Sequence, residues 1–170
     1  GLPVTACDIS FGPDRGTIYV NWSDQRNGNS DTDVWLSKST DGGNTWSLPI
    51  RVNNDPPGKH NFMSWMTLDQ ATGYIYIIFY DRRNYNNDQT DVYLAYSTDA
   101  GNTFTNVKVS DSAFTPSNGI FFGDYINITA FNGKVRPVWT RLANGISSIW
   151  TAIVDFPTGL NEANNFSLHT

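Results

Sequence analysis

Short runs of apolar residues recur along the chain, and polar or glycine-containing segments separate them. In one stretch, residues 62–68 alternate loosely between apolar and polar side chains, and residues 74–80 are rich in aromatic and β-branched side chains. After a polar segment, two further runs follow at residues 91–97 and 104–109. Runs of this length and composition predict β-strands. The pattern therefore predicts a unit of four strands in about 57 residues.

This four-stranded unit is repeated along the chain. The sequence GTIYVNWSDQRN at residues 16–27 returns as GYIYIIFYDRRN at residues 73–84. Likewise, STDGGNTW at residues 39–46 returns as STDAGNTF at residues 97–104. A third and weaker copy, without the octapeptide, covers residues 132–155. Repeated four-stranded units are typical of the blades of a β-propeller.

The repeat predicts an all-β fold, a β-propeller of four-stranded antiparallel blades, with about three blades in this chain. The expected blades span about residues 1–56, 57–116 and 117–156, and residues 157–170 are expected to form a linker or a C-terminal tail. A closed propeller has roughly four to eight blades. The chain is therefore expected to be a piece of a longer protein, unless two copies complete a ring.

Composition supports a packed, aromatic-rich domain. Apolar residues make up 39% of the 170 residues and aromatic residues 14%, whereas 16% are charged. These values argue against disorder. The net charge of −5 opposes binding to nucleic acid, and no apolar run is long enough to predict a membrane span. Cys7 is the only cysteine, which excludes an intramolecular disulfide and a metal site built from several thiolates.

The two octapeptides resemble a known motif. Both fit the pattern Ser-x-Asp-x-Gly-x-Thr-aromatic, which is similar to the Asp box of the BNR repeats in sialidases and related secreted propellers. The resemblance covers about residues 8–155. It implies part of a six-bladed, sialidase-like ring in a secreted or cell-surface bacterial protein. The remaining blades would belong to the same parent protein or to a second copy of the chain, and the ligand would be a glycan or glycoconjugate.

We expect the octapeptides to form structural turns between the third and fourth strands of their blades. The aspartate can accept hydrogen bonds from backbone N–H groups, the glycine can adopt a positive φ, and the aromatic side chain can pack between sheets. The alternative is a carboxylate catalyst or metal ligand, although turn chemistry alone accounts for every position. The residues concerned are Ser39, Asp41, Gly43, Thr45, Trp46, Ser97, Asp99, Gly101, Thr103 and Phe104.

Candidate ligand-binding residues are expected on the rim opposite the octapeptides, which is also the rim that the resemblance implies for substrate. Arginine pairs suit a planar carboxylate, such as that of a sialic acid, through bidentate hydrogen bonds. The alternative is that the repeated Asp–Arg pairs are ion pairs that brace neighbouring loops. The candidates are Asp24, Arg26, Asp81, Arg82, Arg83, Asp124, Tyr125 and Arg141.

A complete catalytic set is not expected in this chain. By resemblance, a sialidase would use three arginines, an Asp acid–base and a Tyr nucleophile activated by Glu. The only Glu is Glu162, outside the repeats, and no Arg-Ile-Pro occurs near the start. If the parent protein is an enzyme, a glycoside hydrolase of the sialidase type is expected. The alternative is a non-catalytic scaffold for protein–protein interaction or domain spacing.

No cofactor is expected. The segments at residues 27–33 and 84–91 offer clustered oxygen ligands that suit Ca²⁺, but solvated hairpin loops explain them as well. The two histidines, His60 and His169, are isolated and predict no metal site.

Overall fold

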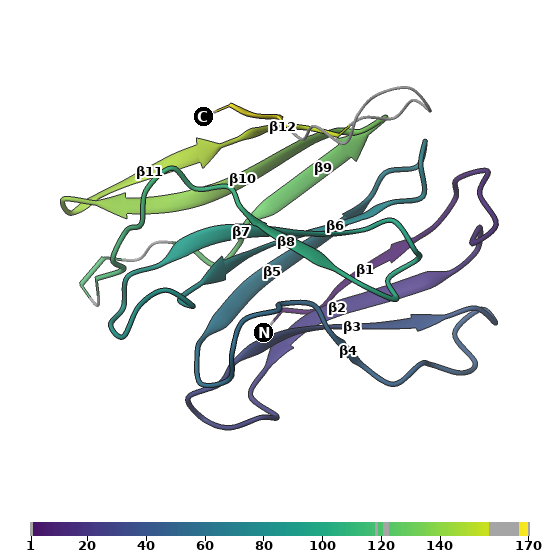
Figure 1. Cartoon of the computed structure of the whole chain (residues 1–170), viewed down its shortest axis with the longest axis horizontal. Coiled ribbons are helices and arrows are strands. Elements are labelled where there is room, and N and C mark those ends of the chain that lie inside the picture. The colour runs from purple at the N-terminus through teal and green to yellow at the C-terminus, as the bar shows by residue number, and fades with distance from the viewer. Residues whose placement is uncertain (1, 118, 121–122, 157–166, 170) are drawn as a thin grey trace.

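Every regular element that the structure describes is a β-strand (Figure 1). The computed structural model describes residues 2–117, 119–120, 123–156 and 167–169. Blade 1 consists of β1 (Val4–Cys7), β2 (Ile18–Asp24), β3 (Asp33–Ser39) and β4 (Ile50–Arg51). Blade 2 consists of β5 (Asn61–Leu68), β6 (Ile75–Asp81), β7 (Asp91–Ser97) and β8 (Thr105–Lys108). No helix that could cross a membrane occurs in the described part of the chain.

Blade 3 has five strands in four positions. They are β9 (Asn127–Phe131), β10 (Lys134–Ala143), β11 (Ile146–Thr151), β12 (Ile153–Asp155) and β13 (Ser167–His169). β11 and β12 follow each other along one edge of β10, interrupted at Ala152, while β9 pairs with the other edge and β13 pairs with β12. The expected all-β partial propeller of antiparallel blades is confirmed. Of the expected linker or tail, residues 157–166 and 170 lie outside the described residues.

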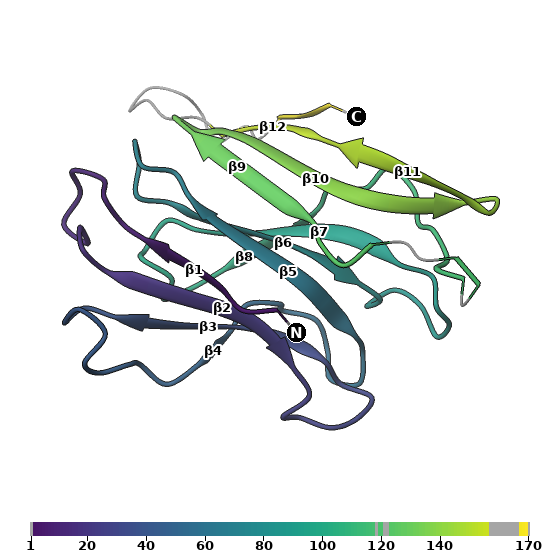
Figure 2. The same ribbon diagram turned by 180° about the vertical axis from the view of Figure 1, so that it is seen from behind.

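The blades stack side by side and bury apolar side chains between them (Figures 1 and 2). Ile75, Ile77 and Phe79 of β6 pack in the core shared with blade 1. Tyr76 and Ile78, on the opposite face of β6, pack in the core shared with blade 3. Because side chains of a strand alternate between its two faces, a sheet covered on both sides is apolar throughout. All residues of β6 are accordingly buried.

The first strands of the three blades lie next to one another along one side of the stack. β5 contacts β1 of blade 1 and β9 of blade 3, and Figure 2 shows these strands side by side. The pairing of β5 with β6 shifts between Phe62 and Trp65, and Met63 within this bulge has a φ of 50°. A positive φ is strained for a residue that carries a side chain. Since bulges change the direction of side chains, β5 presents an irregular surface.

Both octapeptides form turns after the third strand of their blade, held by their own side chains. Asp99 accepts hydrogen bonds from the backbone N–H and the hydroxyl of Thr103, at 2.9 and 2.7 Å. Thr45 binds Asp41 in the same way, at 2.9 and 2.7 Å. The Thr45 hydroxyl lowers the pKa of Asp41 to about 2. Although burial opposes it, hydrogen bonds from Thr103 and Ser97 lower the pKa of Asp99 to about 2 as well.

The two turns differ in what covers them. Phe104 packs against the core between blades 1 and 2, whereas Trp46, at the same position of the first octapeptide, is 45% exposed. The glycines show the same contrast. A Cβ on Gly101 would lie 2.6 Å from Cδ2 of Leu36 in blade 1, whereas a Cβ on Gly43 would meet no atom within 4 Å. The octapeptide of blade 2 is therefore part of the interface with blade 1.

The substitution Gly101→Ala should destabilise the protein more than Gly43→Ala. Both glycines have a positive φ, 77° and 93°, so both substitutions strain the backbone by about 1–2 kcal/mol. Only the change at position 101 also pushes a methyl group against buried Leu36, and overpacking of this kind costs about 1–3 kcal/mol more. Urea unfolding of the two variants measures the difference. Equal losses of stability would contradict a role for this turn in the blade interface.

The octapeptide aspartates should make the protein less stable in acid. The folded pKa of both is about 2, against an ordinary value of 3.8. Their stabilising contribution is therefore complete above about pH 4 and is lost as the pH falls through about 2. In urea unfolding between these pH values, Asp99→Asn should show a shallower decline of stability than the unaltered protein. Parallel curves for the two proteins would count against this origin of acid sensitivity.

Candidate ligand-binding site

The loop after β2 carries the first Asp–Arg pair. Arg26 donates to both carboxylate oxygens of Asp24, with a shortest contact of 2.6 Å. The indole N–H of Trp22 donates to the same carboxylate at 2.7 Å, and the guanidinium lies 4.4 Å from the ring centroid of Trp35. The hydrogen bonds from Arg26 hold the pKa of Asp24 well below its usual range. Asp24 is therefore a permanently ionised acceptor near neutral pH.

The loop after β6 repeats this pair in a buried setting. Arg83 and Asp81 form an ion pair of 2.7 Å, and Asp81 is fully buried. The guanidinium lies 4.0 Å from the ring centroid of Tyr93 and donates to the Asn54 side chain at 2.7 Å. Asn54 follows β4, so this contact links blade 2 to blade 1. Burial raises the pKa of Asp81, against the opposing effect of Arg83.

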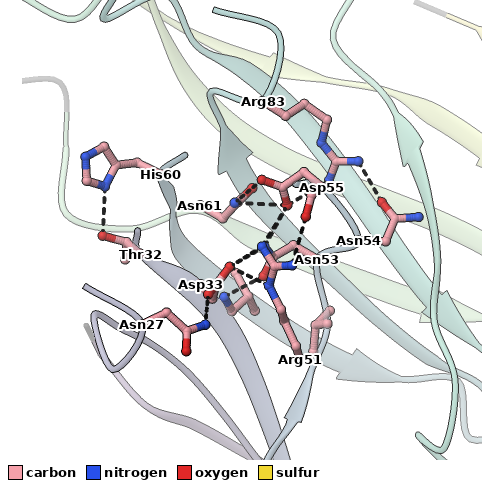
Figure 3. A network of polar contacts seen from close by, with 12 residues as sticks. Asn27, Thr32, Asp33, Arg51, Asn53, Asn54, Asp55, His60, Asn61 and Arg83 are labelled. Atoms are coloured by element: carbon pink, nitrogen blue, oxygen red, sulfur yellow. Dashed lines mark hydrogen bonds and ion pairs between the residues drawn. The ribbon is translucent and has the colours of Figure 1, made fainter. Parts of the chain in front are cut away.

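A network of charged and amide side chains surrounds this link (Figure 3). Asp33 of β3 forms an ion pair of 2.6 Å with Arg51. Asn53 donates to Asp33 and to Asp55, in both cases at 2.7 Å. Asp55 in turn lies 3.9 Å from the Arg83 guanidinium of blade 2. The acids and bases here are committed to one another, so the network braces the joint between blades 1 and 2.

Asp33 and Asp55 are not among the predicted ligand-binding residues, although the repeat carries a signal for Asp33. Asp33 pairs across the sheet with Asp24, and the corresponding Asp91 pairs with Asp81. In both blades, one aspartate thus ends the second strand and another begins the third strand opposite it. Like charges at opposed positions destabilise a sheet unless cations accompany them. This signal could have predicted the surrounding basic residues.

Arg141 of β10 repeats the arrangement at the joint between blades 2 and 3. Its guanidinium lies 4.4 Å from the ring centroid of Trp150 and donates to the Ser112 hydroxyl at 2.6 Å. Ser112 lies in the segment after β8. Arg83 and Arg141 therefore both stack on an aromatic side chain of their own blade and hydrogen-bond to the segment that ends the preceding blade. Arg26 stacks in the same way, but no preceding blade lies among the described residues.

A hollow of about 650 Å³ lies where the three blades meet. Its walls come from the end of β2 and the loop between β2 and β3, from the bulged part of β5, and from the segment before β9. Among the residues that line it are Asp24, Gln25, Thr32, Trp65, Asp124 and Tyr125. Three of the sequence candidates, Asp24, Asp124 and Tyr125, are thus brought together. Among the other candidates, Arg82 lines a separate hollow, and Asp81, Arg83 and Arg141 lie in the blade joints.

We call this space the blade hollow. Aromatic and acidic side chains line it. Tyr125 is 63% exposed, and its ring meets Trp65 edge-on, with centroids 6.2 Å apart and planes at 82°. Asp24 and Asp124 add two carboxylates, and among the described lining residues there is no lysine or arginine. The hollow therefore offers an aromatic surface and hydrogen-bond acceptors, without a cation that could pair with an anionic ligand.

Met63 and Thr32 also line the hollow, and sequence analysis missed both. Met63 reaches it through the bulge in β5, and the broken alternation of residues 62–68 was the only trace of that bulge in the sequence. Thr32 lies in a segment that composition marked only as a polar loop. Its position follows from the close approach of blades 1 and 2, where Thr32 and His60 form a β-bridge.

No group of three or more His, Cys, Asp or Glu side chains within the described ranges is arranged to hold a metal ion. In the segments whose composition suits Ca²⁺, Asp33 pairs with Arg51 and Asp88 pairs with Arg82. The expectation of no cofactor, with calcium as the alternative, stays a prediction.

Comparison with known proteins finds the fold in glycoside-cleaving enzymes. No family model matches the chain, and no curated protein matches it. Among solved structures, the Hadza microbial sialidase Hz136 matches with a TM-score of 0.58 and 14% identity, over 90% of this chain and 34% of that chain. Zg3597, a family 117 glycoside hydrolase of the marine bacterium Zobellia galactanivorans, matches with a TM-score of 0.57 and 15% identity, over 98% of this chain and 54% of that chain.

A third similar structure is a mutant of the α-L-arabinofuranosidase arb93a from Fusarium graminearum, in complex with an iminosugar inhibitor. It matches with a TM-score of 0.55 and 14% identity, over 98% of this chain and 49% of that chain. Identities this low show a shared fold alone. The chain spans between 34% and 54% of the length of these three structures. The fold is therefore that of part of a glycosidase-like β-propeller.

The substitution Arg83→Gln should destabilise the protein far more than Arg26→Gln. The Arg83 side chain is 14% exposed and pairs with a fully buried carboxylate, and removing one partner of such a pair costs about 3–5 kcal/mol. Arg26 is the matched control, because its side chain is 37% exposed and its pair with Asp24 lies at the surface. An exposed pair contributes about 0–1 kcal/mol. Thermal and urea unfolding measure both changes, and similar losses would contradict the bracing role of Arg83.

Proposed function

We propose that this chain is part of a secreted or cell-surface sialidase-like propeller that binds glycans in the blade hollow. The observation that carries the proposal is the exposed Tyr125 ring set against Trp65 inside a hollow of about 650 Å³. Ligand sites for small molecules span roughly 300–1,000 Å³ and combine apolar walls with a few placed polar groups. Sugar rings present C–H groups on their faces and hydroxyls at their edges. An aromatic ring can therefore pack against the face of a sugar while a carboxylate accepts hydrogen bonds from its hydroxyls.

The polar groups of the hollow suit sugar hydroxyls. Asp24 is held in place by Arg26 and Trp22, so it is a preoriented acceptor. The Gln25 amide donates to the Thr32 hydroxyl at 3.2 Å, which fixes a second polar wall. Hydrogen bonds to an ionised acceptor are stronger than neutral ones, and these positions would orient a sugar over the aromatic surface.

We infer that the chain on its own binds and does not hydrolyse glycosides. Glycoside hydrolysis commonly needs a pair of carboxyl groups, one of which is protonated and acts as a general acid. Asp24 is unsuited to that role, because the Arg26 hydrogen bonds keep its pKa low. If the parent protein is a glycoside hydrolase of the sialidase type, the missing groups come from its remaining blades.

The outer face of blade 1 supports completion of the ring by another blade. Trp46 is 45% and Leu48 87% exposed there, whereas Phe104, the repeat equivalent of Trp46, is packed against the preceding blade. The covering blade belongs to the same parent protein or to a second copy of this chain. Analytical ultracentrifugation distinguishes the two: a dimer supports a second copy, and a monomer supports further blades of the parent.

The substitution Tyr125→Ala should weaken glycan binding by about two- to twelvefold, because an aromatic contact of this kind contributes about 0.5–1.5 kcal/mol. The ring is 63% exposed, so folding should be little affected. Phe131→Ala is the matched control: Phe131 is 69% exposed on β9 and does not line the hollow. A glycan array, followed by calorimetry on the best-retained glycan, measures both variants.

Equal binding by the unaltered protein and Tyr125→Ala would remove the hollow as the glycan site. If no glycan on the array is retained, the glycan-binding proposal itself is wrong. The non-catalytic scaffold for protein–protein interaction would then be the better reading of this propeller.

A further inference from the structure

A second hollow, of about 330 Å³, opens on the same rim as the blade hollow. Its walls come from the segment that joins blades 1 and 2 and from the loop after β6. Lys59, His60 and Arg82 line it, and Asp88 is its one acidic lining residue within the described part of the chain. We call this second space the joint hollow. It gathers basic side chains in a chain whose net charge is −5.

The basic side chains of the joint hollow are held in place by neutral partners as well as by Asp88. The Lys59 ammonium donates to the side-chain oxygen of Asn86 at 2.7 Å. Arg82 pairs with Asp88 at 2.7 Å and lies 5.2 Å from the ring centroid of Phe62. The Asp88 side chain is 71% exposed, so solvent weakens its hold on the guanidinium. Lys59 also donates to the backbone oxygen of Tyr85, so its two partners are uncharged and one of its three N–H groups is left for an anion that enters the hollow.

The walls of the two hollows are in contact. Thr32, which lines the blade hollow, forms a hydrogen bond of 2.9 Å with Nδ1 of His60, which lines the joint hollow (Figure 3). Phe62 also lines the blade hollow, and Arg82 of the joint hollow is stacked over its ring. A ligand longer than one sugar unit would therefore pass from one hollow to the other across the Thr32–His60 contact.

The hollows are opposite in charge. The blade hollow contains Asp24 and Asp124 without a lysine or arginine among its described lining residues, and the joint hollow contains Lys59 and Arg82. An anionic sugar in the blade hollow would face the carboxylate of Asp124 and that of Asp24, whose partner Arg26 is already committed to it. In the joint hollow the same anionic group would meet charge-assisted donors.

We infer that the two hollows form one groove for an acidic glycan, with an uncharged sugar on Trp65 and Tyr125 and a neighbouring carboxylate or sulfate group held by Lys59, His60 and Arg82. This inference rests on the proposed glycan binding, and it adds the substrate class. It also places the anionic group beside the blade joint, away from the aromatic surface. The groove thereby selects for the order of charged and uncharged units along a chain.

The test is a glycan array that carries each oligosaccharide in an uncharged form and in a matched uronate or sulfated form. The unaltered protein should retain the charged members more strongly, by about tenfold, because charge-assisted hydrogen bonds are among the stronger polar contacts. Raising the salt concentration from about 50 to about 500 mM should reduce this preference, since exposed charges are screened.

The variant Lys59→Gln should lose most of the preference for charged members while keeping its binding to uncharged ones. Lys134→Gln is the matched control, because Lys134 is a 67% exposed lysine on β10 that lines neither hollow. It should behave as the unaltered protein does. Thermal unfolding measurements check that both variants are folded.

Three outcomes overturn part of this reasoning, and they can be told apart. Equal retention of charged and uncharged members would refute the acidic-glycan inference and leave the proposed glycan binding intact. A charge preference that survives Lys59→Gln would refute the joint hollow as its source. Retention of no glycan at all would refute the proposed function, and with it this inference.

Discussion

Burial of both faces of β6 requires a neighbouring blade on each side. Ile75, Ile77 and Phe79 pack against blade 1, and Tyr76 and Ile78 pack against blade 3. Each fully buried large apolar side chain contributes about 1.5–3 kcal/mol. No single four-stranded sheet could bury these side chains by itself. The blades are therefore stable only as neighbours, and each position in a blade is shaped by what the adjacent blade presents.

Stacking of the blades buries polar side chains where the loops meet at the blade joints, and arginines supply their hydrogen-bond partners. Asp81 ends β6 in a fully buried position, and a buried carboxylate is tolerated only when it is paired and hydrogen-bonded. Arg83 pairs with it, stacks on Tyr93 and reaches Asn54 of blade 1. Arg141 makes the corresponding contacts between blades 2 and 3, with Trp150 and Ser112. The arginine thus recurs where the joint between blades recurs. These arginines were candidates for anion binding in the sequence, and in the structure they connect neighbouring blades.

The candidate site arises where this regularity fails. The bulge in β5 places Met63 at a positive φ and changes the direction of the strand nearest the blade hollow. Tyr125 lies in an unrepeated segment before β9 and leaves its ring exposed beside Trp65. Because neither feature recurs in the other blades, the hollow differs from the repeated joints. The single, irregular part of a repeat protein is where a specific ligand site is expected, and here it adjoins a joint hollow of opposite charge.

The strands, the blades and the turns can be predicted from the sequence, because they depend on local features that repeat. The apolar run of β6, the two octapeptides and the polar loops are each specified by a few neighbouring residues. The sequence also selected Asp24, Asp124 and Tyr125 as candidates. Only the tertiary structure separated them from Arg83 and Arg141, because contacts between blades join residues far apart in the chain. The exposure of Tyr125, the burial of Asp81 and the contact between the walls of the two hollows depend on how closely neighbouring sheets approach, and no local pattern of residues encodes that distance.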